Sequence, residues 1–110
     1  AGVGNRGEGN LPGERNAYKN ELGRIFYEAW VLPDSLRNRG LKVILVLHID
    51  RSGKILKTDI KETSGNRLFD ESVKRAVSKV KTGGGVPPLP SKISEAIWEQ
   101  GLIFDPKYKR

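Results

Sequence analysis

The fold is decided by one stretch, Leu41-Lys42-Val43-Ile44-Leu45-Val46-Leu47-His48-Ile49, which is the most apolar run in the chain. The turn-forming residues Asp50-Arg51-Ser52-Gly53 follow it, and a second strand-like run extends from Ile55 to Thr63. Asp favours the start of a type I turn, and glycine at position 53 supplies the positive φ that returns the chain. The stretch therefore predicts a β-hairpin.

The two arms of the hairpin differ in polarity. The first arm has apolar side chains on both faces of the strand. One face carries Val43, Leu45, Leu47 and Ile49, and the other carries Ile44 and Val46. This pattern is typical of a central strand. The second arm carries charged residues between its few apolar ones, which predicts a strand with one exposed face.

Composition limits the function classes. The 110 residues form one domain with a modest core, and a net charge of +7 favours an anionic partner or surface. Since cysteine is absent, a disulfide framework and a thiolate metal site are excluded. No apolar run approaches the ~20 residues that span a bilayer. The chain starts at Ala1 without methionine, so we expect it to be a piece of a longer protein, and any membrane anchor would lie outside this piece.

The chain before the hairpin divides into a linker and a helix. Residues 1–16 are glycine-rich and polar and are expected to form a flexible linker, the end of a stalk. Asn16 is a candidate cap for a helix that starts at Ala17 and ends before Pro33. One apolar stripe at helical spacing marks its buried face: Tyr18, Leu22, Ile25, Phe26 and Ala29.

The chain after the hairpin begins with a second helix. Asn66 is its expected cap, Gly83-Gly84-Gly85 its end, and its stripe consists of Phe69, Val73, Ala76, Val77 and Val80. A polyproline-like stretch over 86–90 leads to a short helix capped by Ser91, which contains Ile93, Ala96, Ile97 and Trp98. Gly101 is expected to end that helix, a last short strand to follow over Leu102–Asp105, and a basic tail to occupy 107–110.

These elements predict an α+β fold with a three-stranded antiparallel sheet and helices packed on one face. A right-handed crossover past the first strand gives the spatial order second, first, third. The third strand is then an edge, and the opposite face of the sheet, around Ile44, Val46 and His48, is partly open.

The residues do not indicate an enzyme, a cofactor or a metal. His48 has no neighbouring nucleophile in the sequence, and one imidazole without thiolates makes no zinc site. The Asp50–Gly53 stretch lacks the further acidic positions of a calcium loop. The three glycines at 83–85 follow a helix instead of leading into one, so they predict a flexible loop and not a phosphate site. The carboxylates Asp59, Glu62, Asp70 and Glu71 form no convergent acid/base pair.

Nucleic-acid binding is the main alternative to protein binding. The residues that suggest a basic patch are Lys74, Arg75, Lys79, Lys81, Lys107, Lys109 and Arg110. Acidic residues are interspersed through every element, and no stacking aromatics, helix-turn-helix or finger motif appears. A specific nucleic-acid partner is therefore not expected.

The edge strand is the feature that indicates a partner. A short C-terminal edge guarded only by Asp105 and the basic tail allows an extended segment of another protein to add as a further strand. Each added backbone hydrogen bond contributes roughly 0.5–1.5 kcal/mol, so a few of them give weak to moderate affinity.

The ordered motifs resemble the C-terminal domains of TonB and TolA over Tyr18 to Pro106. The motifs are Trp30-Val31-Leu32-Pro33, the hairpin with its turn, Ser64-Gly65-Asn66 before Phe69-Asp70, and Pro87-Pro88-Leu89-Pro90. The ending Leu102-Ile103-Phe104-Asp105-Pro106, preceded by the expected short helix, looks more like TolA. The glycines at 83–85 and the absence of a cysteine pair depart from the pattern.

The resemblance implies a periplasmic domain over 17–106, at the end of a stalk anchored in the inner membrane. Such proteins use the proton gradient, through an inner-membrane channel complex, to act on outer-membrane and periplasmic partners. TolA-like domains support envelope integrity and are exploited by colicins and filamentous phage, whereas TonB-like ones act on siderophore and vitamin receptors. In both groups partners commonly add a strand to the sheet. This assigns partner binding to Gln100, Gly101, Leu102, Ile103, Phe104 and Asp105.

Overall fold

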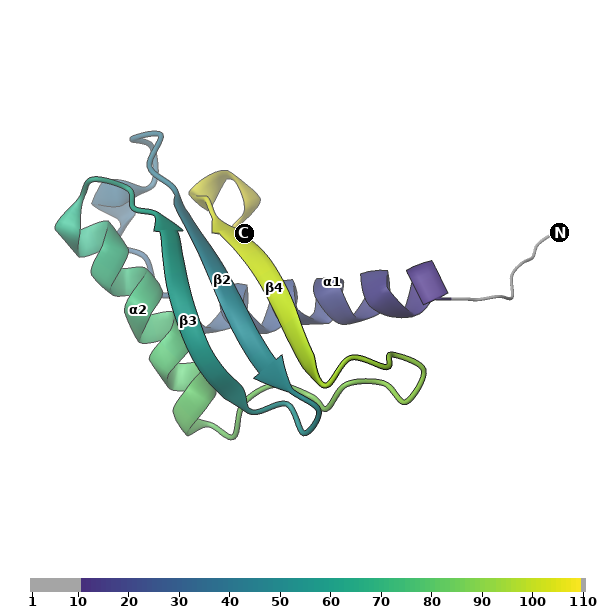
Figure 1. Cartoon of the computed structure of the whole chain (residues 1–110). Coiled ribbons are helices and arrows are strands. Elements are labelled where there is room, and N and C mark those ends of the chain that lie inside the picture. Colours follow the sequence, from purple (N-terminus) through teal and green to yellow (C-terminus); the bar gives the residue numbers. More distant parts are fainter. Residues whose placement is uncertain (1–10, 110) are drawn as a thin grey trace, which may run out of the picture.

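The computed structural model describes residues 11–109. Figure 1 looks onto one face of a three-stranded sheet, with both helices lying behind it. The strands are β2 (Val43–Asp50), β3 (Ile55–Glu62) and β4 (Ile97–Phe104). The helices are α1 (Leu11–Ala29) and α2 (Arg67–Thr82), and two short 3₁₀ turns, η2 (Asp34–Leu36) and η3 (Pro106–Tyr108), complete the fold.

The sheet has the predicted topology. Its order is β3-β2-β4, with β2 in the centre and antiparallel to both neighbours. The hairpin turn is also confirmed, since Gly53 has a φ of 92° and donates its N–H to the carbonyl oxygen of Asp50. The strand that follows the crossover, β4, therefore lies at an edge of the sheet.

The core lies between the helices and one face of the sheet. Along β2 buried and half-buried residues alternate, with Val43, Leu45, Leu47 and Ile49 buried. The ring of Trp30 meets the rings of Phe69 and Phe104 edge to face, and its Nε1 donates to the Ser72 hydroxyl at 2.8 Å. Burying these apolar surfaces stabilises the fold by roughly 25 cal/mol per Å². The opposite face, around Ile44, Val46 and His48, is only half-buried, as predicted.

The second helix is confirmed in its cap and its buried stripe. The Asn66 side chain accepts a hydrogen bond from the Phe69 N–H at 3.1 Å, and the five predicted stripe residues are all buried. Asp70 lies in its first turn and Lys79 and Lys81 in its last, as the helix dipole favours.

The start of α1 differs from the prediction. The helix begins at Leu11 and not at Ala17, so Asn16 lies inside it and is not its cap. Proline is tolerated in the first turn of a helix, where its missing N–H has no intrahelical partner, so Pro12 does not mark a linker. Tertiary contacts also hold this turn, since Arg15 pairs with Glu95 at 2.5 Å. Residues 1–10 of the expected linker lie outside the described residues.

The predicted short helix after Ser91 is wrong, and the last strand is longer than predicted. Residues 91–96 form turns, and β4 starts at Ile97 and passes through Gly101. Three apolar residues within one helical turn do not distinguish a helix from a strand. Tertiary packing decides here, because exposed and buried residues alternate along the whole of β4 and place Trp98 against Tyr18, at 5.3 Å between ring centroids.

Candidate functional site

The predicted partner-binding residues lie along β4 and just after it. Gln100, Leu102 and Phe104 are buried on the core face of the sheet, whereas Gly101 and Ile103 lie on the opposite face. Asp105 follows the strand as the cap of η3, where its carboxylate accepts the Lys107 N–H at 3.1 Å. The side chains of these six residues therefore do not form one surface. What they share is the backbone of an edge strand.

The direction of the backbone groups follows from the hairpin turn. Asp50 donates its N–H to Lys54 and accepts the Gly53 N–H, so its polar groups face β3. The direction of the backbone N–H and C=O groups alternates along an antiparallel strand. The backbone groups of the alternate residues therefore point toward β4, and these residues are Val43, Leu45, Leu47 and Ile49. Their partners are Phe104, Leu102, Gln100 and Trp98.

The backbone groups of the β4 residues between those partners consequently point outward, away from the sheet. Glu99, Gly101 and Ile103 point their N–H and C=O groups away from β2. Among residues 11–109, the N–H groups of these three residues donate to no turn, loop or side-chain acceptor. Unpaired N–H groups at a strand edge are what a further strand would bind.

Tyr27 on α1 closes one end of this edge, a contact that no pattern in the sequence indicates. Its hydroxyl donates to the carbonyl oxygen of Ile103 at 2.5 Å and accepts the N–H of Asp105 at 3.0 Å. Its ring stacks on Phe104, with an angle of 11° between the planes. Burial raises the pKa of the Tyr27 hydroxyl, and the Asp105 backbone contact opposes this. The Ile103 carbonyl oxygen and the Asp105 N–H are thus already occupied by Tyr27 and are not available to a partner strand.

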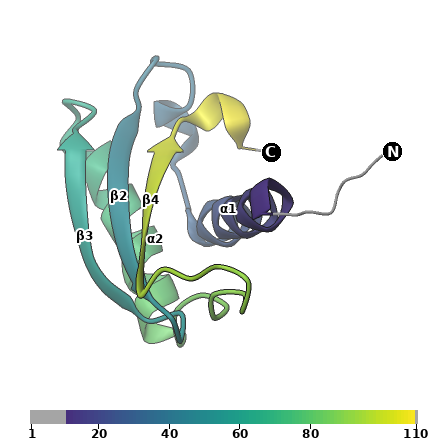
Figure 2. The ribbon, with the colours of Figure 1, turned by 45° about the vertical axis from the view of Figure 1, so that its right-hand side comes forward.

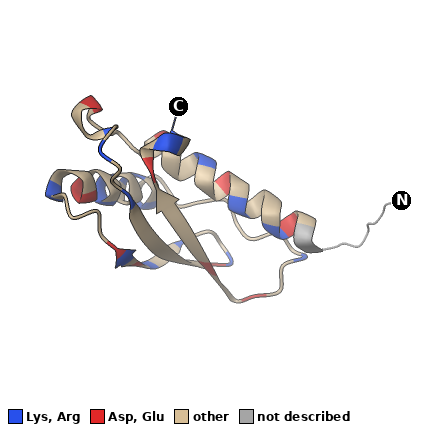
Figure 3. Ribbon diagram, turned by 90° about the horizontal axis from the view of Figure 1, so that it is seen from above, with Lys and Arg blue, Asp and Glu red and all other residues tan. Residues whose placement is uncertain are grey.

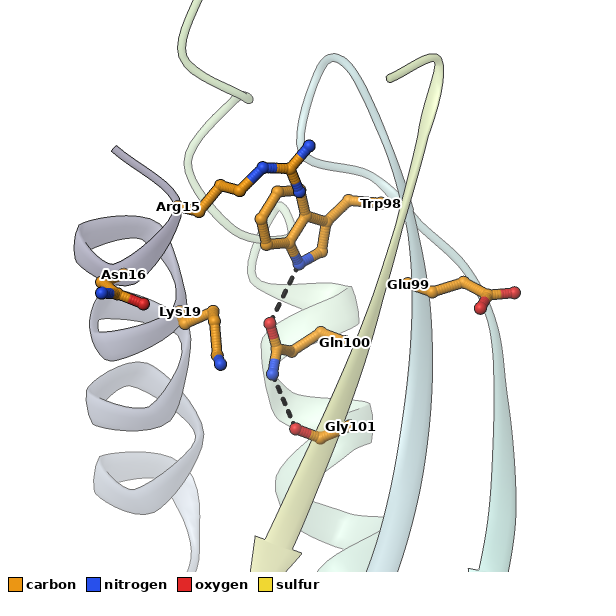
Figure 4. Close-up of a pocket in the computed structure, with 7 residues that line it drawn as sticks. All are labelled: Arg15, Asn16, Lys19, Trp98, Glu99, Gln100 and Gly101. Atoms are coloured by element: carbon orange, nitrogen blue, oxygen red, sulfur yellow. Dashed lines mark hydrogen bonds between the residues drawn. The ribbon is translucent and has the colours of Figure 1, made fainter. Parts of the chain in front are cut away.

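A buried amide occupies a third outward group. The Trp98 indole donates to Gln100 Oε1 at 3.0 Å, and Gln100 Nε2 donates to the carbonyl oxygen of Gly101 at 2.7 Å. Figure 4 shows this chain of hydrogen bonds running along β4. Buried polar groups need such partners, so the network fixes the Gln100 side chain beneath the edge.

A groove of about 600 Å³ separates this edge from the N-terminal half of α1. It is lined by Arg15, Asn16, Lys19, Trp98, Glu99, Gln100 and Gly101. In Figure 4 the Lys19 side chain extends from α1 toward β4, whereas Glu99 points away from the helix. The Arg15 guanidinium lies over the Trp98 ring, 5.2 Å from its centroid. Figure 2 shows α1 beside β4, with the helix seen nearly end-on while the strand stands upright.

Arg51, in the hairpin turn, holds the loop that leads into β4. Its guanidinium donates to the carbonyl oxygens of Pro90 at 3.2 Å, Ile93 at 2.5 Å and Glu95 at 2.8 Å. Below it Val86 donates its N–H to the carbonyl oxygen of Gly53 at 2.9 Å. The hairpin turn thus fixes where β4 starts.

One of the three glycines predicted to form a loop, Gly85, packs against this turn. A Cβ on Gly85 would lie 2.4 Å from the carbonyl oxygen of Gly53, and Gly85 has a φ of 85°. The predicted end of α2 is confirmed, since Gly83 is its C-cap. Gly85 therefore allows close approach of the loop backbone to the hairpin turn.

Several basic residues of the nucleic-acid alternative have structural roles. Lys79 and Lys109 donate to the carbonyl oxygens of Ala29 at 3.3 Å and Tyr27 at 3.0 Å, at the C-terminal end of α1. Cations are favoured at that end of a helix dipole. Burial lowers the pKa of Lys109. In Figure 3 blue and red residues are interspersed along α1, as expected for a surface of mixed charge.

The remaining candidates are explained by local structure. The Asp50 carboxylate accepts the Ser52 hydroxyl at 2.6 Å and the Lys54 N–H at 3.0 Å, and these contacts hold its pKa below the ordinary value. His48 lies between Asp59 at 3.2 Å and Glu99 at 3.5 Å on the open face. Within residues 11–109 no cluster of three or more His, Cys, Asp or Glu side chains is placed to hold a metal ion. In the same range no helix has the length and apolar character needed to cross a membrane.

Comparison with known proteins gives a family and a fold. A family model described as TonB C terminal matches residues 15–99. The chain is similar to the solution NMR structure of TolAIII bound to a peptide derived from the N-terminus of TolB. The TM-score is 0.66 and the identity 23%, and the match covers 96% of this chain and 80% of the other. No curated protein matches. These findings confirm the resemblance predicted from the sequence, and the structural match shows a shared fold.

Proposed function

Because the chain belongs to the TonB C-terminal family, we propose that it is the partner-binding domain of a TolA-type cell-envelope protein, with a TonB-type transducer as the alternative within the family. It acts in the periplasm, and an anchor outside this chain connects it to a proton-driven inner-membrane complex. It binds extended segments of periplasmic or outer-membrane proteins by strand addition to β4. Colicins and phage coat proteins would use the same edge.

One observation carries this proposal. The outward N–H groups of Glu99, Gly101 and Ile103 lie along one edge, beside a groove of about 600 Å³. Strand addition uses such groups for affinity and the neighbouring pockets for specificity. The TolAIII relative is bound to a TolB peptide, which supports a peptide segment as the partner.

The structure suggests binding and not catalysis as the role of this surface. Strand addition needs only backbone groups. The side chains that line the groove are a Trp–Gln pair, two cations, an amide and Glu99, whose carboxylate points away from the helix (Figure 4). Domains of this family are protein-interaction domains. No cofactor takes part in the proposed function.

The test uses a pair of proline variants. The N–H of Leu102 faces β2 and that of Ile103 faces outward, so Leu102→Pro breaks the sheet, whereas Ile103→Pro leaves it folded. The Ile103→Pro protein should lose binding to a TolB N-terminal peptide. The matched control Ile103→Ala keeps the N–H and should keep binding.

The readouts are a circular-dichroism melt and a fluorescence-anisotropy titration of the labelled peptide. A folded Ile103→Pro protein that binds as the parent does would contradict docking at β4. The open face around Ile44, Val46 and His48 would then be the better candidate.

A further inference from the structure

We propose that the groove between α1 and β4 selects the chemistry of the strand it receives, an inference that rests on the strand addition proposed above. The selected segment carries an acidic side chain on the side that faces α1. It carries a large apolar side chain on the other side, over Gly101. A segment of a partner protein with these alternating residues is the occupant to which the geometry points.

The position of the segment is limited by Tyr27. That hydroxyl occupies the outward carbonyl oxygen of Ile103 and the N–H of Asp105, so pairing ends there. The stretch left for an added strand is centred on Glu99 and Gly101, next to the groove that begins at Arg15. Because residues directly opposite each other in a sheet share a face, the side of each incoming side chain is determined by its partner on β4.

Side chains opposite Gln100 enter the groove and meet α1. The charged groups on that wall are Arg15 and Lys19, since Glu99 lies on the other face and points away (Figure 4). Arg15 is already paired with Glu95. Lys19 has no ion pair among the described residues. A carboxylate on the incoming strand would therefore find an ammonium group, and a lysine there would meet two cations.

The residue opposite Gly101 lies on the open face, where a side chain is missing. The φ of Gly101 is not positive, and a Cβ built on it meets no atom within 4 Å. Neither backbone geometry nor crowding therefore requires glycine here. A glycine in a strand interior weakens the strand and often marks the close approach of another backbone.

The neighbours of this gap are apolar. Val46 lies directly across from Gly101 on β2, and Ile103, with 49% of its surface exposed, lies on the same face of β4. A large side chain from the next strand covers an edge glycine well. The gap at Gly101 therefore favours Phe, Tyr, Leu or Ile at the facing position.

The experiment titrates short synthetic peptides of alternating sequence, observed through the amide signals of the ¹⁵N-labelled protein. One peptide alternates Glu with Val and has a single Phe among the Val positions. Two others replace Glu by Gln or by Lys, and a fourth replaces Phe by Ala. The Glu peptide should bind roughly fivefold more tightly than the Gln peptide, and the Lys peptide more weakly than either.

Two variants assign the effect to named residues. Lys19→Glu should reverse the preference between the Glu and Lys peptides, whereas Lys61→Glu makes the same charge change on β3 and should leave it unchanged. Gly101→Val fills the gap and should remove the preference for Phe over Ala. Circular-dichroism melts establish that each variant is folded.

The outcomes separate this inference from the function on which it rests. If all peptides shift the Gly101 and Ile103 amides with equal affinity, strand addition holds and the selection is wrong. If no peptide shifts these amides, strand addition itself is wrong. If the amides shift with protein concentration alone, a second copy occupies the edge and the proposed occupant is wrong.

Discussion

The Tyr27 hydroxyl of α1 donates a hydrogen bond to the Ile103 carbonyl oxygen of β4 over 2.5 Å. The Tyr27 hydroxyl oxygen also accepts the N–H of Asp105, so one side chain occupies two groups of an open sheet edge. Native proteins protect exposed edges in such ways against unwanted pairing. Tyr27 protects only the C-terminal end of β4. Farther along the edge Gln100 holds the Gly101 carbonyl oxygen, and the outward N–H groups of Glu99 and Gly101 are left for a partner.

Replacing Tyr27 with Phe tests this relationship. Tyr27→Phe keeps the ring that stacks on Phe104 and removes both hydrogen bonds, so the free energy of unfolding should fall by about 1–2 kcal/mol. Denaturant unfolding followed by circular dichroism measures the change. Tyr108→Phe is the matched control, because Tyr108 is exposed and its hydroxyl makes no hydrogen bond within the described residues. Equal stability of all three proteins would show that the Tyr27 hydroxyl does not hold the edge.

The same contact predicts a dependence on alkaline pH. Burial raises the pKa of Tyr27 above its ordinary value of 10.0, so the folded protein keeps a proton that the unfolded chain releases. The contribution of this hydroxyl to the free energy of unfolding is fully present below the pKa that Tyr27 has in the unfolded chain. It is lost as the pH rises through the pKa of Tyr27 in the folded protein. The stability difference between the parent and Tyr27→Phe should therefore shrink above about pH 10. A stability difference that stays constant or grows above this pH would contradict the stabilising role of the protonated Tyr27 hydroxyl.

Arg51 should stabilise the loop before β4. Arg51→Ala removes charged donors from three carbonyl oxygens and should lower the free energy of unfolding by about 2 kcal/mol. Arg67→Ala removes an exposed pair with Glu71 on α2 and should cost less than about 1 kcal/mol. Chemical denaturation of both variants makes the comparison. Equal losses would mean that the loop does not depend on Arg51.

Two glycines should respond in opposite ways to alanine. Gly101→Ala should raise the free energy of unfolding by about 0.5–1 kcal/mol, because alanine orders at a smaller entropic cost and fits the open space. Gly53→Ala should lower it by more than about 1 kcal/mol, because φ is 92° and the new Cβ would lie 1.9 Å from the Val86 carbonyl oxygen. Thermal melts of the two variants decide this. Stabilisation by Gly53→Ala would contradict the close packing of the turn.

The sequence predicts the hairpin, the central place of β2 and the buried stripe of α2, because each depends on a local period and a recognisable turn or cap. It does not predict the length of β4, since Ile93, Ala96 and Ile97 fit a helix locally and only packing of Trp98 on Tyr18 favours a strand. The start of α1 was also missed, because Arg15 is held by Glu95, distant in sequence.

For the candidate site, the sequence predicts an edge strand but not which backbone groups point outward. Register decides that, and register comes from the pairing of β2 with β4. The closure by Tyr27 could not be predicted, because it depends on how α1 crosses the sheet. The i, i+4, i+8 and i+12 spacing of Arg15, Lys19, Gly23 and Tyr27 was the available signal for a helix face along the groove.

Amide hydrogen exchange tests strand addition at β4 most directly. The measurement compares the protein alone with the protein saturated by a TolB N-terminal peptide, residue by residue, using NMR. If the partner adds to β4, the N–H groups of Glu99, Gly101 and Ile103 become protected on binding, while those of the β3 edge do not change. Protection confined to β3 or to the open face, with these three amides exchanging as in the free protein, would contradict it.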